Sequence, residues 1–315
     1  MQAVVVHDDE TLGWEERPDP VPGDTELLVD VRGAGLNGAD MLQRRGRYPA
    51  PPGSPPDIPG MELAGVVAAA GRQVTRFAVG DRVMGLVGGG AQATLAVVDE
   101  THVLAVPDRL GWAEAGGFPE VFATAHDALF TQAGLAMGER VLVTGAAGGV
   151  GTAGVQLARG TGAHVVAAVR AEAARDQVAE LGADEVIDPA AIADHGPYDV
   201  VLELVGAATL PAALGALATG GRVVVIGVAG SGAKTEVDLR RLMGLRARIS
   251  ASTLRGRDRP GKAAVVRGLE RHVAPLLADG RIAVPVCDTF AMADAEAAYD
   301  RFAAGHKFGK IVLVS

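Results

Sequence analysis

The stretch RVLVTGAAGGVGTAGVQLAR, residues 140–159, decides the fold of the second half of this chain. Its first five residues are typical of a buried strand, and the apolar residues after Val150 recur at helical spacing. Between them, residues 146–151 (AAGGVG) form a glycine-rich turn whose backbone can approach a ligand closely. A strand, such a turn and a helix in this order are typical of a dinucleotide-binding unit. The alternative is a tight turn that needs glycine for its conformation alone.

Two glycines of the turn have separate expected roles. Gly148 lets the backbone approach the pyrophosphate, and Gly151 lets the helix pack tightly on the strand. The free N–H groups at the start of the helix also favour an anion. The end of the fifth strand adds further contacts, because an open α/β sheet binds its ligand beyond the carboxyl edge. The residues assigned to the cofactor on these grounds are Ala147, Gly148, Gly149, Val150, Gly227, Val228 and Ala229.

The residues after the second strand bear on which dinucleotide binds. NAD-binding chains place an acid about 20 positions after the glycine turn, on the ribose 2′-hydroxyl. Here the strand 164–169 is followed by Arg170, and Arg175 comes about one turn later. Guanidinium groups suit a 2′-phosphate, so the sequence favours NADPH over NADH. The alternative for Arg170 is a solvated charge at a strand end.

The chain changes character near residue 120. Before it, short apolar runs are separated by turns rich in Gly and Pro, which predicts a strand-rich domain. After it, apolar runs alternate with helical patterns, which predicts a parallel sheet with helices on both faces. We therefore expect an α/β protein with a Rossmann nucleotide-binding domain, a doubly wound parallel sheet, at 120–255. The other domain comprises 1–119 and 256–315, because the end of the chain is expected to fold back onto it.

The expected elements follow from these patterns. Strands of the first domain are expected at 3–6, 27–31, 63–69, 82–86, 94–98, 103–106 and 310–314. Strands of the second are expected at 140–144, 164–169, 185–187, 199–203, 222–226 and 249–252, and helices at 150–160, 172–181, 209–218, 238–245 and 262–278.

Composition limits the partners and the compartment. A net charge of −9 argues against nucleic acid and against an anionic membrane surface. No apolar run is long enough to span a bilayer, and the opening residues MQAVVVHDDE do not resemble a signal peptide. The single cysteine, Cys287, excludes an internal disulfide and a Cys-rich zinc site. It suits a cytoplasmic protein.

Several further motifs lie in family order along nearly the whole chain. They are N-x-x-D-x-x-x-R-x-G-x-Y at 37–48, IPGMELAG at 58–65, GDRV at 80–83, FPEVFATAHDAL at 118–129, GGRVVVIG at 220–227, STLRGR at 252–257 and GKIVL at 309–313. With them the sequence resembles the zinc-free quinone oxidoreductase branch of the medium-chain dehydrogenase/reductase superfamily. The resemblance implies a GroES-like, β-rich catalytic domain beside the Rossmann domain, with the active site in the cleft between them.

The resemblance also bears on metal. Zinc alcohol dehydrogenases of this superfamily have a Cys where this chain has Asn37 and a His where it has Met61. Zinc needs three or four converging N, S or O ligands, and the seven His show no paired ligand spacing. We expect a site without zinc or any other metal. Hydride transfer to an acceptor that is already electrophilic, a quinone or an activated C=C, is then favoured over alcohol oxidation.

By the same resemblance, catalytic roles fall to Tyr48 and Asn37. A tyrosine of related enoyl-thioester reductases donates a proton or binds the oxyanion, and Tyr48 matches it. The alternative for Tyr48 is an aromatic that only lines the pocket. Asn37 is expected to face the nicotinamide or its ribose. Asp40 is expected to order its loop by a hydrogen bond, with Arg44 as a candidate partner, and Glu62 to orient the loop electrostatically.

Other cofactor contacts are implied less directly. Thr124 matches a threonine on the nicotinamide side, with a helix-cap hydroxyl as its alternative. The segment HKF at 306–308 is a candidate source of a further cation, and Lys310, which follows it, is assigned to the cofactor. Ala174 and Pro189 stand where some relatives have a Lys and a Tyr that hold the 2′-phosphate, which leaves Arg170 and Arg175 as substitutes.

Three functions remain open at this point. The first is an NADPH-dependent quinone reductase, and the second is an enoyl or enone reductase with Tyr48 as proton donor. The third is an NADPH-binding protein without turnover. The strand 249–252 is expected to be an uncapped edge, which predicts a homodimer formed by pairing with its copy.

Overall fold

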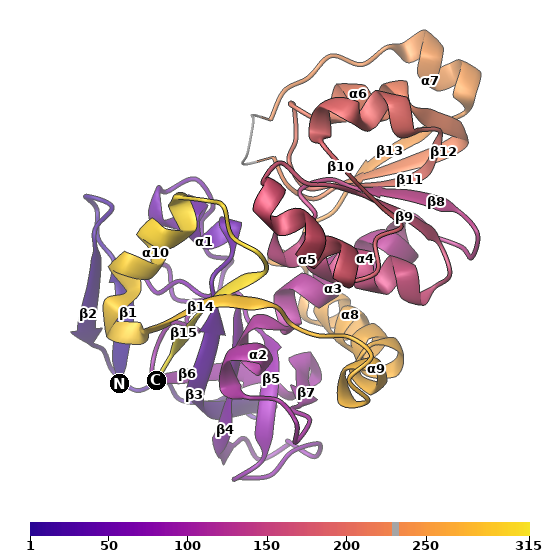
Figure 1. Cartoon of the computed structure of the whole chain (residues 1–315). Coiled ribbons are helices and arrows are strands. Elements are labelled where there is room, and N and C mark those ends of the chain that lie inside the picture. Colours follow the sequence, from indigo (N-terminus) through magenta and orange to yellow (C-terminus); the bar gives the residue numbers. More distant parts are fainter. Residues whose placement is uncertain (229–232) are drawn as a thin grey trace. The chain divides into compact units, whose positions relative to one another are not determined.

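This computed structural model of the protein describes residues 1–228 and 233–315, so Ala229 lies outside the described residues. The chain forms two compact units (Figure 1). Unit 1 comprises Met1–Glu120, Leu254–Gly305 and Lys310–Ser315, and unit 2 comprises Val121–Thr253 and His306–Gly309. The segment 306–309 therefore differs from the expected division: the Gly309 N–H donates to the Ala147 carbonyl of unit 2 at 2.8 Å.

Unit 1 is built on a sheet in the order β14-β15-β3-β4-β5-β7, with β6 paired to β3 and a separate pair β1-β2. The strands are β1 Gln2–Val6, β2 Leu12–Glu16, β3 Glu26–Gly35, β4 Glu62–Ala70, β5 Arg82–Leu86, β6 Leu95–Asp99, β7 Val103–Ala105, β14 Val286–Ala291 and β15 Lys310–Val314. Strand β15 runs antiparallel to β3, which returns the end of the chain to this unit. The sequence patterns missed β2, whose residues LGWEE contain no apolar run.

Five helices lie in unit 1, and α3 begins at its boundary. They are α1 Gly38–Arg44, α2 Trp112–Gly117, α8 Arg259–His272, α9 Ala274–Ala278 and α10 Ala295–Ala303, with α3 at Pro119–His126. The single helix expected at 262–278 is wrong. Pro275 stands in the first turn of α9, where its missing N–H costs nothing, but it cannot continue α8.

Unit 2 is a six-stranded, wholly parallel sheet in the order β10-β9-β8-β11-β12-β13. The strands are β8 Arg140–Val143, β9 His164–Ala168, β10 Glu185–Ile187, β11 Tyr198–Glu203, β12 Leu217–Val225 and β13 Arg248–Ala251. Counted within the unit this is 3-2-1-4-5-6, the doubly wound Rossmann order. The predicted fold class is confirmed.

Helices cover both faces of this sheet, with α4 and α5 on one side and α6 and α7 on the other (Figure 1). They are α4 Gly149–Gly160, α5 Arg175–Glu180, α6 Leu210–Gly215 and α7 Leu239–Leu245. The helix expected at 209–218 extends beyond the end of α6. Its last residues belong instead to β12, where Leu217 already pairs with Tyr198 of β11.

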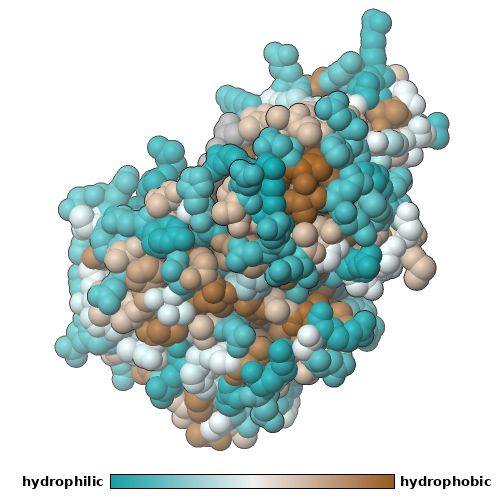
Figure 2. Space-filling view, viewed as in Figure 1, coloured by the Kyte–Doolittle hydropathy of each residue, from teal (hydrophilic) through white to brown (hydrophobic). Residues whose placement is uncertain are grey.

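No helix among the described residues is long and apolar enough to cross a membrane. Hydrophilic side chains predominate on the face seen in Figure 2, with apolar side chains in scattered patches between them. Larger exposed apolar side chains gather in one part of unit 2, around α7 and β13: Val228, Val237, Leu239, Met243 and Ile249.

Candidate active site

The loop between β3 and α1 is ordered by a buried carboxylate. Asp40 is fully buried and accepts from the backbone N–H of Asn37 at 2.8 Å and of Gly60 at 3.1 Å. Burial raises the pKa of Asp40 to about 6, against the effect of these two hydrogen bonds. Asp40 thus orders the loop as expected, but Arg44 is not its partner, because Arg44 pairs with Glu296.

A buried ion pair lies beside this loop. The Lys310 ammonium is 2.6 Å from Glu62 Oε1, and their side chains are 3% and 0% exposed. Lys310 also donates to Asn37 Oδ1 and to the Leu36 carbonyl, both at 2.8 Å. Asn37 Nδ2 completes the group by donating to Glu62 Oε1 at 2.9 Å. Each partner of the pair therefore has several hydrogen bonds, which a buried pair needs to offset its desolvation.

The close approach of Glu62 depends on a glycine. A Cβ on Gly35 would lie 2.3 Å from Glu62 Oε1. The second oxygen of Glu62 accepts from the backbone N–H of Glu120 at 2.8 Å. The Glu62 carboxylate is therefore the point at which the ends of β3, β4 and β15 and the start of α3 meet. These contacts show how Glu62 orders the loop, as expected. Its pairing with Lys310 was not predicted.

Tyr48 lies in the loop after α1 and is partly exposed. The guanidinium of Arg255 stands over its ring, 5.2 Å from the centroid. Burial raises the pKa of Tyr48, the charge of Glu120 raises it further, and Arg255 opposes both. The phenol therefore keeps its proton at neutral pH and can donate a hydrogen bond, as its expected role requires.

Glu120 is a titratable group that the sequence analysis did not single out. Burial, followed by the nearby charge of Glu62, raises its pKa to about 8, and Lys310 and Lys262 oppose the shift. The motif FPE at 118–120 marks the position, but the sequence gives no sign of the charges around it. At neutral pH this carboxyl is largely protonated.

Glu120→Gln is expected to change the pH dependence of stability. The pKa of Glu120 is about 8 in the folded chain and 4.5 ordinarily, so the folded state holds the proton more tightly. Wild type should lose stability as pH rises from about 4.5 to about 8, and the uncharged Gln should not. The unfolding temperature of the variant should exceed that of wild type at pH 9 but not at pH 5. An equal difference at both values would contradict the assignment.

In unit 2 the glycine turn has room for a ligand. Gly148 is the N-cap of α4 and no side chain caps it, so the first N–H groups of the helix have no carbonyl within it to bond. A Cβ on Gly148 would touch only the Gly145 carbonyl, at 3.4 Å. A Cβ on Gly151 would lie 2.5 Å from that carbonyl, so Gly151 is needed for packing. The turn therefore has room for a pyrophosphate, and the assignment of Gly148, Gly149 and Val150 to it stays a prediction.

The two arginines assigned to the 2′-phosphate differ in their surroundings. Arg170 is exposed just beyond β9 and makes no ion pair within the described part of the chain. Arg175 donates to Asp188 at 2.9 Å and to the Val169 carbonyl at 3.4 Å. Arg170 is thus the cation more available to an anion.

Three further assigned residues are placed as follows. Thr124 is buried near the end of α3, so its alternative as a helix N-cap is wrong. Gly227 follows β12, and a Cβ there would lie 2.4 Å from the Leu204 carbonyl. Lys310 directs its ammonium to Glu62 and Asn37, and its contact with a cofactor stays a prediction.

A buried carboxylate at the end of β11 was also missed. Glu203 Oε1 accepts from the hydroxyls of Thr144 and Thr209, at 2.9 and 2.8 Å. It also accepts from the N–H groups of Val205 and Gly206, at 2.8 and 2.9 Å. Glu203 therefore fixes the turn at the carboxyl edge of the sheet. All four bonds converge on one carboxylate oxygen, and the other, Oε2, is buried without a hydrogen-bond partner among the described residues.

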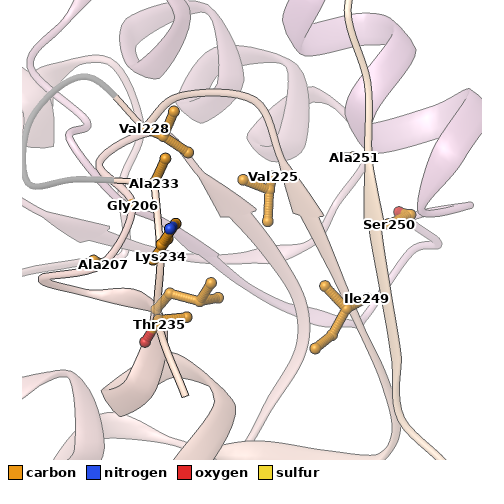
Figure 3. A pocket seen from close by; sticks show the side chains of 11 residues that line it. Gly206, Ala207, Val225, Val228, Ala233, Lys234, Thr235, Ile249, Ser250 and Ala251 are labelled. Atoms are coloured by element: carbon orange, nitrogen blue, oxygen red, sulfur yellow. The ribbon is translucent and has the colours of Figure 1, made fainter. Parts of the chain in front are cut away.

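Beyond that turn, unit 2 contains a cavity of about 320 Å³. Figure 3 shows Gly206, Val225, Val228, Lys234 and Ile249 around it. Most of its lining is apolar. Val228, one of the residues assigned to the cofactor, is part of that lining. Residues of the edge strand β13 also line this cavity.

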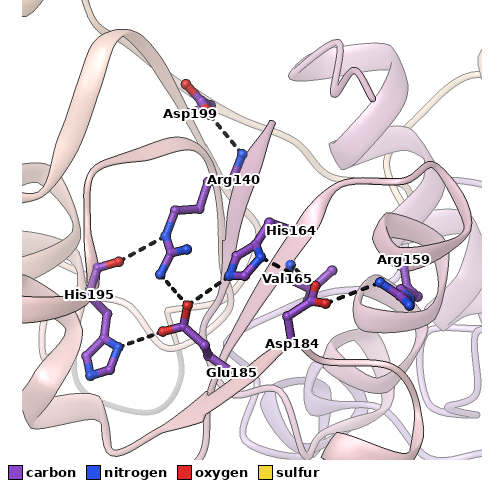
Figure 4. Close-up of polar contacts among 8 residues, drawn as sticks. All are labelled: Arg140, Arg159, His164, Val165, Asp184, Glu185, His195 and Asp199. Atoms are coloured by element: carbon purple, nitrogen blue, oxygen red, sulfur yellow. Dashed lines mark hydrogen bonds and ion pairs between the residues drawn. The ribbon is translucent and has the colours of Figure 1, made fainter. Parts of the chain in front are cut away.

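A separate polar cluster joins the amino ends of β8, β9 and β10 (Figure 4). Glu185 accepts from Arg140 at 2.7 Å, from His164 at 2.8 Å and from His195 at 2.7 Å. The hydrogen bonds from His195 and His164 lower the pKa of Glu185 to about 2. Because the glycine turn follows the carboxyl end of β8, this cluster braces the opposite edge of the sheet.

Asn37 and Met61 stand at the positions where zinc enzymes of the superfamily have a Cys and a His. Asn37 is engaged with Glu62 and Lys310, and Met61 is buried beside them. Within residues 1–228 and 233–315, no three His, Cys, Asp or Glu side chains are placed to hold a metal ion together. The site therefore does not fit zinc with its usual ligand set.

Comparison with known proteins places this geometry in a family. Residues 23–132 match the family "Alcohol dehydrogenase GroES-like domain", and residues 149–266 match "Zinc-binding dehydrogenase". Quinone oxidoreductase of Sus scrofa is 34% identical over 224 residues, which cover 67% of each chain. The chain belongs to the medium-chain dehydrogenase/reductase superfamily. The fold of this superfamily binds a nicotinamide cofactor.

Solved structures of the superfamily agree over the whole chain. An alcohol dehydrogenase superfamily protein from Novosphingobium aromaticivorans has a TM-score of 0.89 and 31% identity, covering 100% of this chain and 99% of that one. A mycobacterial protein complexed with NADPH has a TM-score of 0.87 and 27% identity, covering 100% of both. The predicted combination of a GroES-like and a Rossmann domain is confirmed.

Large synthases also contain a similar segment. Polyketide synthase GfsB of Streptomyces halstedii is 42% identical over 207 residues, which are 64% of this chain and 4% of that protein. A mycocerosic acid synthase-like polyketide synthase of Mycobacterium tuberculosis is 32% identical over 302 residues, 93% of this chain and 14% of that protein. The chain thus spans a small fraction of these relatives.

Proposed function

We propose that this protein is a metal-free, NADPH-dependent reductase that transfers a hydride to a quinone. The observation that carries the proposal is the group Asn37–Glu62–Lys310, in which Asn37 takes the position of a cysteine of the superfamily's zinc enzymes. Its charges neutralise one another within hydrogen-bond distance. An acceptor must then be electrophilic without help from a metal, and a quinone is. The similarity to quinone oxidoreductase of Sus scrofa supports the same acceptor.

The cofactor, when bound, supplies the hydride. Quinone reduction then consumes one hydride and one proton and yields a hydroquinone. The backbone of the glycine turn orients the pyrophosphate, and Arg170 offers a cation to the 2′-phosphate. Tyr48 keeps its proton at neutral pH and lines the site of the quinone, whose oxygen takes its proton with little help from a protein acid. Arg175, Thr124, Gly227, Val228 and Asn37 are proposed cofactor contacts.

A second candidate is reduction of an enone or enoyl thioester. Two observations favour it: the 42% identity to a segment of a polyketide synthase, and the raised pKa of Tyr48, which makes the phenol a proton donor rather than a base. Carbon protonation demands a positioned acid, whereas a quinone oxygen takes its proton readily.

Tyr48→Phe separates the two candidates. With a quinone we expect turnover to stay within about threefold of wild type, because little acid catalysis is needed. With an enone we expect kcat to fall about 100-fold if Tyr48 is the acid. NADPH oxidation by the wild type and the variant, with one quinone and one enone, measures both. A quinone rate that collapses in the variant would contradict the first proposal.

We also propose a homodimer formed through β13. This strand is the edge of its sheet, its four residues are exposed, and Leu239 and Met243 of nearby α7 are 68% and 78% exposed. An unpaired apolar edge favours pairing with its copy.

Ile249→Lys is expected to break that dimer, because the charge would be buried at the shared edge. Light scattering at micromolar concentration should give twice 32.1 kDa for wild type and 32.1 kDa for the variant. A monomeric wild type would contradict the proposal. We further propose a cytoplasmic enzyme without a nucleic-acid or membrane partner, on its single cysteine and its charge of −9.

A further inference from the structure

Arg255, in the STLRGR motif, is a buried cation. Its side chain is 3% exposed, and it forms no ion pair with any described residue. Its three hydrogen bonds go to neutral acceptors: Nε to the Gly88 carbonyl at 2.7 Å, Nη1 to the Tyr48 carbonyl at 3.0 Å, and Nη2 to Gln43 Oε1 at 2.6 Å. A buried charge is costly, so its retention asks for a reason beyond hydrogen bonding.

These bonds hold the loop 45–57 of unit 1 at two points. Arg255 bonds the Tyr48 carbonyl directly. Gln43 accepts the hydrogen bond from Arg255 Nη2 and itself donates to the Pro56 carbonyl at 3.1 Å. Through Gln43, Arg255 therefore also acts on the far end of the loop. Gly88 lets the neighbouring loop come close, because a Cβ there would lie 2.2 Å from Ser54 Oγ.

The same guanidinium also acts on the Tyr48 ring. It lies 5.2 Å from the ring centroid, within the range of a cation–π interaction. Tyr48 is thus restrained at its backbone and at its ring by one side chain. A cation in this position also stabilises the phenolate that forms whenever the phenol gives up its proton. Lysine could supply the charge but not the planar fork that reaches three acceptors.

We propose that Arg255 is the positioning residue for Tyr48: it clamps the ring and backbone of Tyr48 and stabilises its phenolate. The proposal rests on the proposed function for the part Tyr48 plays in turnover, but the clamp itself does not. The other charged groups that act on the pair are Glu120, which opposes ionisation of Tyr48, and Asp40 and Lys262 near Arg255.

Ultraviolet titration of the tyrosines tests the clamp without any assay of activity. The chain has three tyrosines, and burial raises the pKa of Tyr198 to about 12 and that of Tyr299 well above its usual value. Tyr48 should therefore ionise first, and Tyr48→Phe should remove that step. Arg255→Gln should move it up by about one pH unit, and Arg255→Lys should leave it nearly in place. An unmoved step in Arg255→Gln would overturn the proposal.

Kinetics test the consequence for turnover. With an enone, Arg255→Lys should lower kcat about tenfold with a smaller change in KM, because geometry is lost and charge is kept. In a Tyr48→Phe background the same change should have no further effect. Additive effects in this double-mutant cycle would overturn the positioning role. Arg259→Lys is the matched control: Arg259 pairs with Asp99 at 2.7 Å, and its change should alter neither kcat nor the titration.

The titration and the kinetics distinguish a failure of the clamp from a failure of the proposed function. If Tyr48→Phe leaves every acceptor unaffected but Arg255→Gln still shifts the titration, the clamp is upheld and the role of Tyr48 as the acid of an enone reductase fails. If enone turnover needs Tyr48 but the titration and the cycle show no coupling to Arg255, the function is upheld and the clamp fails.

Discussion

Gly148→Ala is expected to weaken NADPH binding about tenfold or more while leaving thermal unfolding unchanged. Gly148 has φ −78° and ψ 168°, which alanine adopts without strain, and the new Cβ would meet the Gly145 carbonyl only at an ordinary contact distance of 3.4 Å. The methyl group would instead occupy the space through which a pyrophosphate approaches the start of α4. Calorimetric titration with NADPH, beside a thermal melt, measures both effects.

A glycine of the same helix gives the matched control. Nothing lies within 4 Å of a Cβ built on Gly160, so Gly160→Ala should change neither affinity nor fold. Gly151→Ala should behave in the opposite way to Gly148→Ala and destabilise the fold, because its Cβ would lie 2.5 Å from a backbone carbonyl. Unchanged affinity in Gly148→Ala would mean that the dinucleotide does not approach this turn.

Lys310→Met is expected to cost about 3–5 kcal/mol of unfolding free energy, the larger of the stability effects considered. It would leave Glu62, which is 0% exposed, as an uncompensated charge beside Asp40 and Glu120. Adding Glu62→Gln should recover part of the loss, because the buried charge is then removed. Urea unfolding at pH 7 measures each variant.

An exposed ion pair gives the reference for that measurement. Arg72 pairs with Asp24 at 2.7 Å, but their side chains are 78% and 44% exposed. Arg72→Met should therefore change stability by about 1 kcal/mol or less. If Lys310→Met cost no more than Arg72→Met, the group around Glu62 would not be the closed, mutually neutralised unit described above.

The Rossmann half was predictable because its signals are local. The glycine turn, the strand before it and the helix after it are contiguous, and the parallel direction of the strands follows from their alternation with helices. The break between α8 and α9 was missed because Pro275 stands inside an apolar pattern that is typical of one continuous helix. Strand β2 was missed because LGWEE is held by pairing with β1 rather than by an apolar run.

The candidate site was predictable as a set of positions but not as an arrangement. Asn37, Tyr48 and Lys310 were singled out, yet Lys310 lies 248 residues from Glu62, and no local pattern reports such a contact. The clamp on Tyr48 joins it to a residue 207 positions away. Glu120 and Glu203 carry no spacing signal, because their properties come from burial and from backbone groups that only the folded chain brings together.

A metal-free, NADPH-dependent quinone reductase, as proposed here, should not depend on any ion that a chelator removes. NADPH oxidation by a quinone is followed with purified protein before and after dialysis against a chelator. We predict the same rate before and after dialysis, with NADPH preferred over NADH. Loss of turnover on chelation and its return with Zn²⁺ would contradict the claim, and so would tight NADPH binding without any turnover.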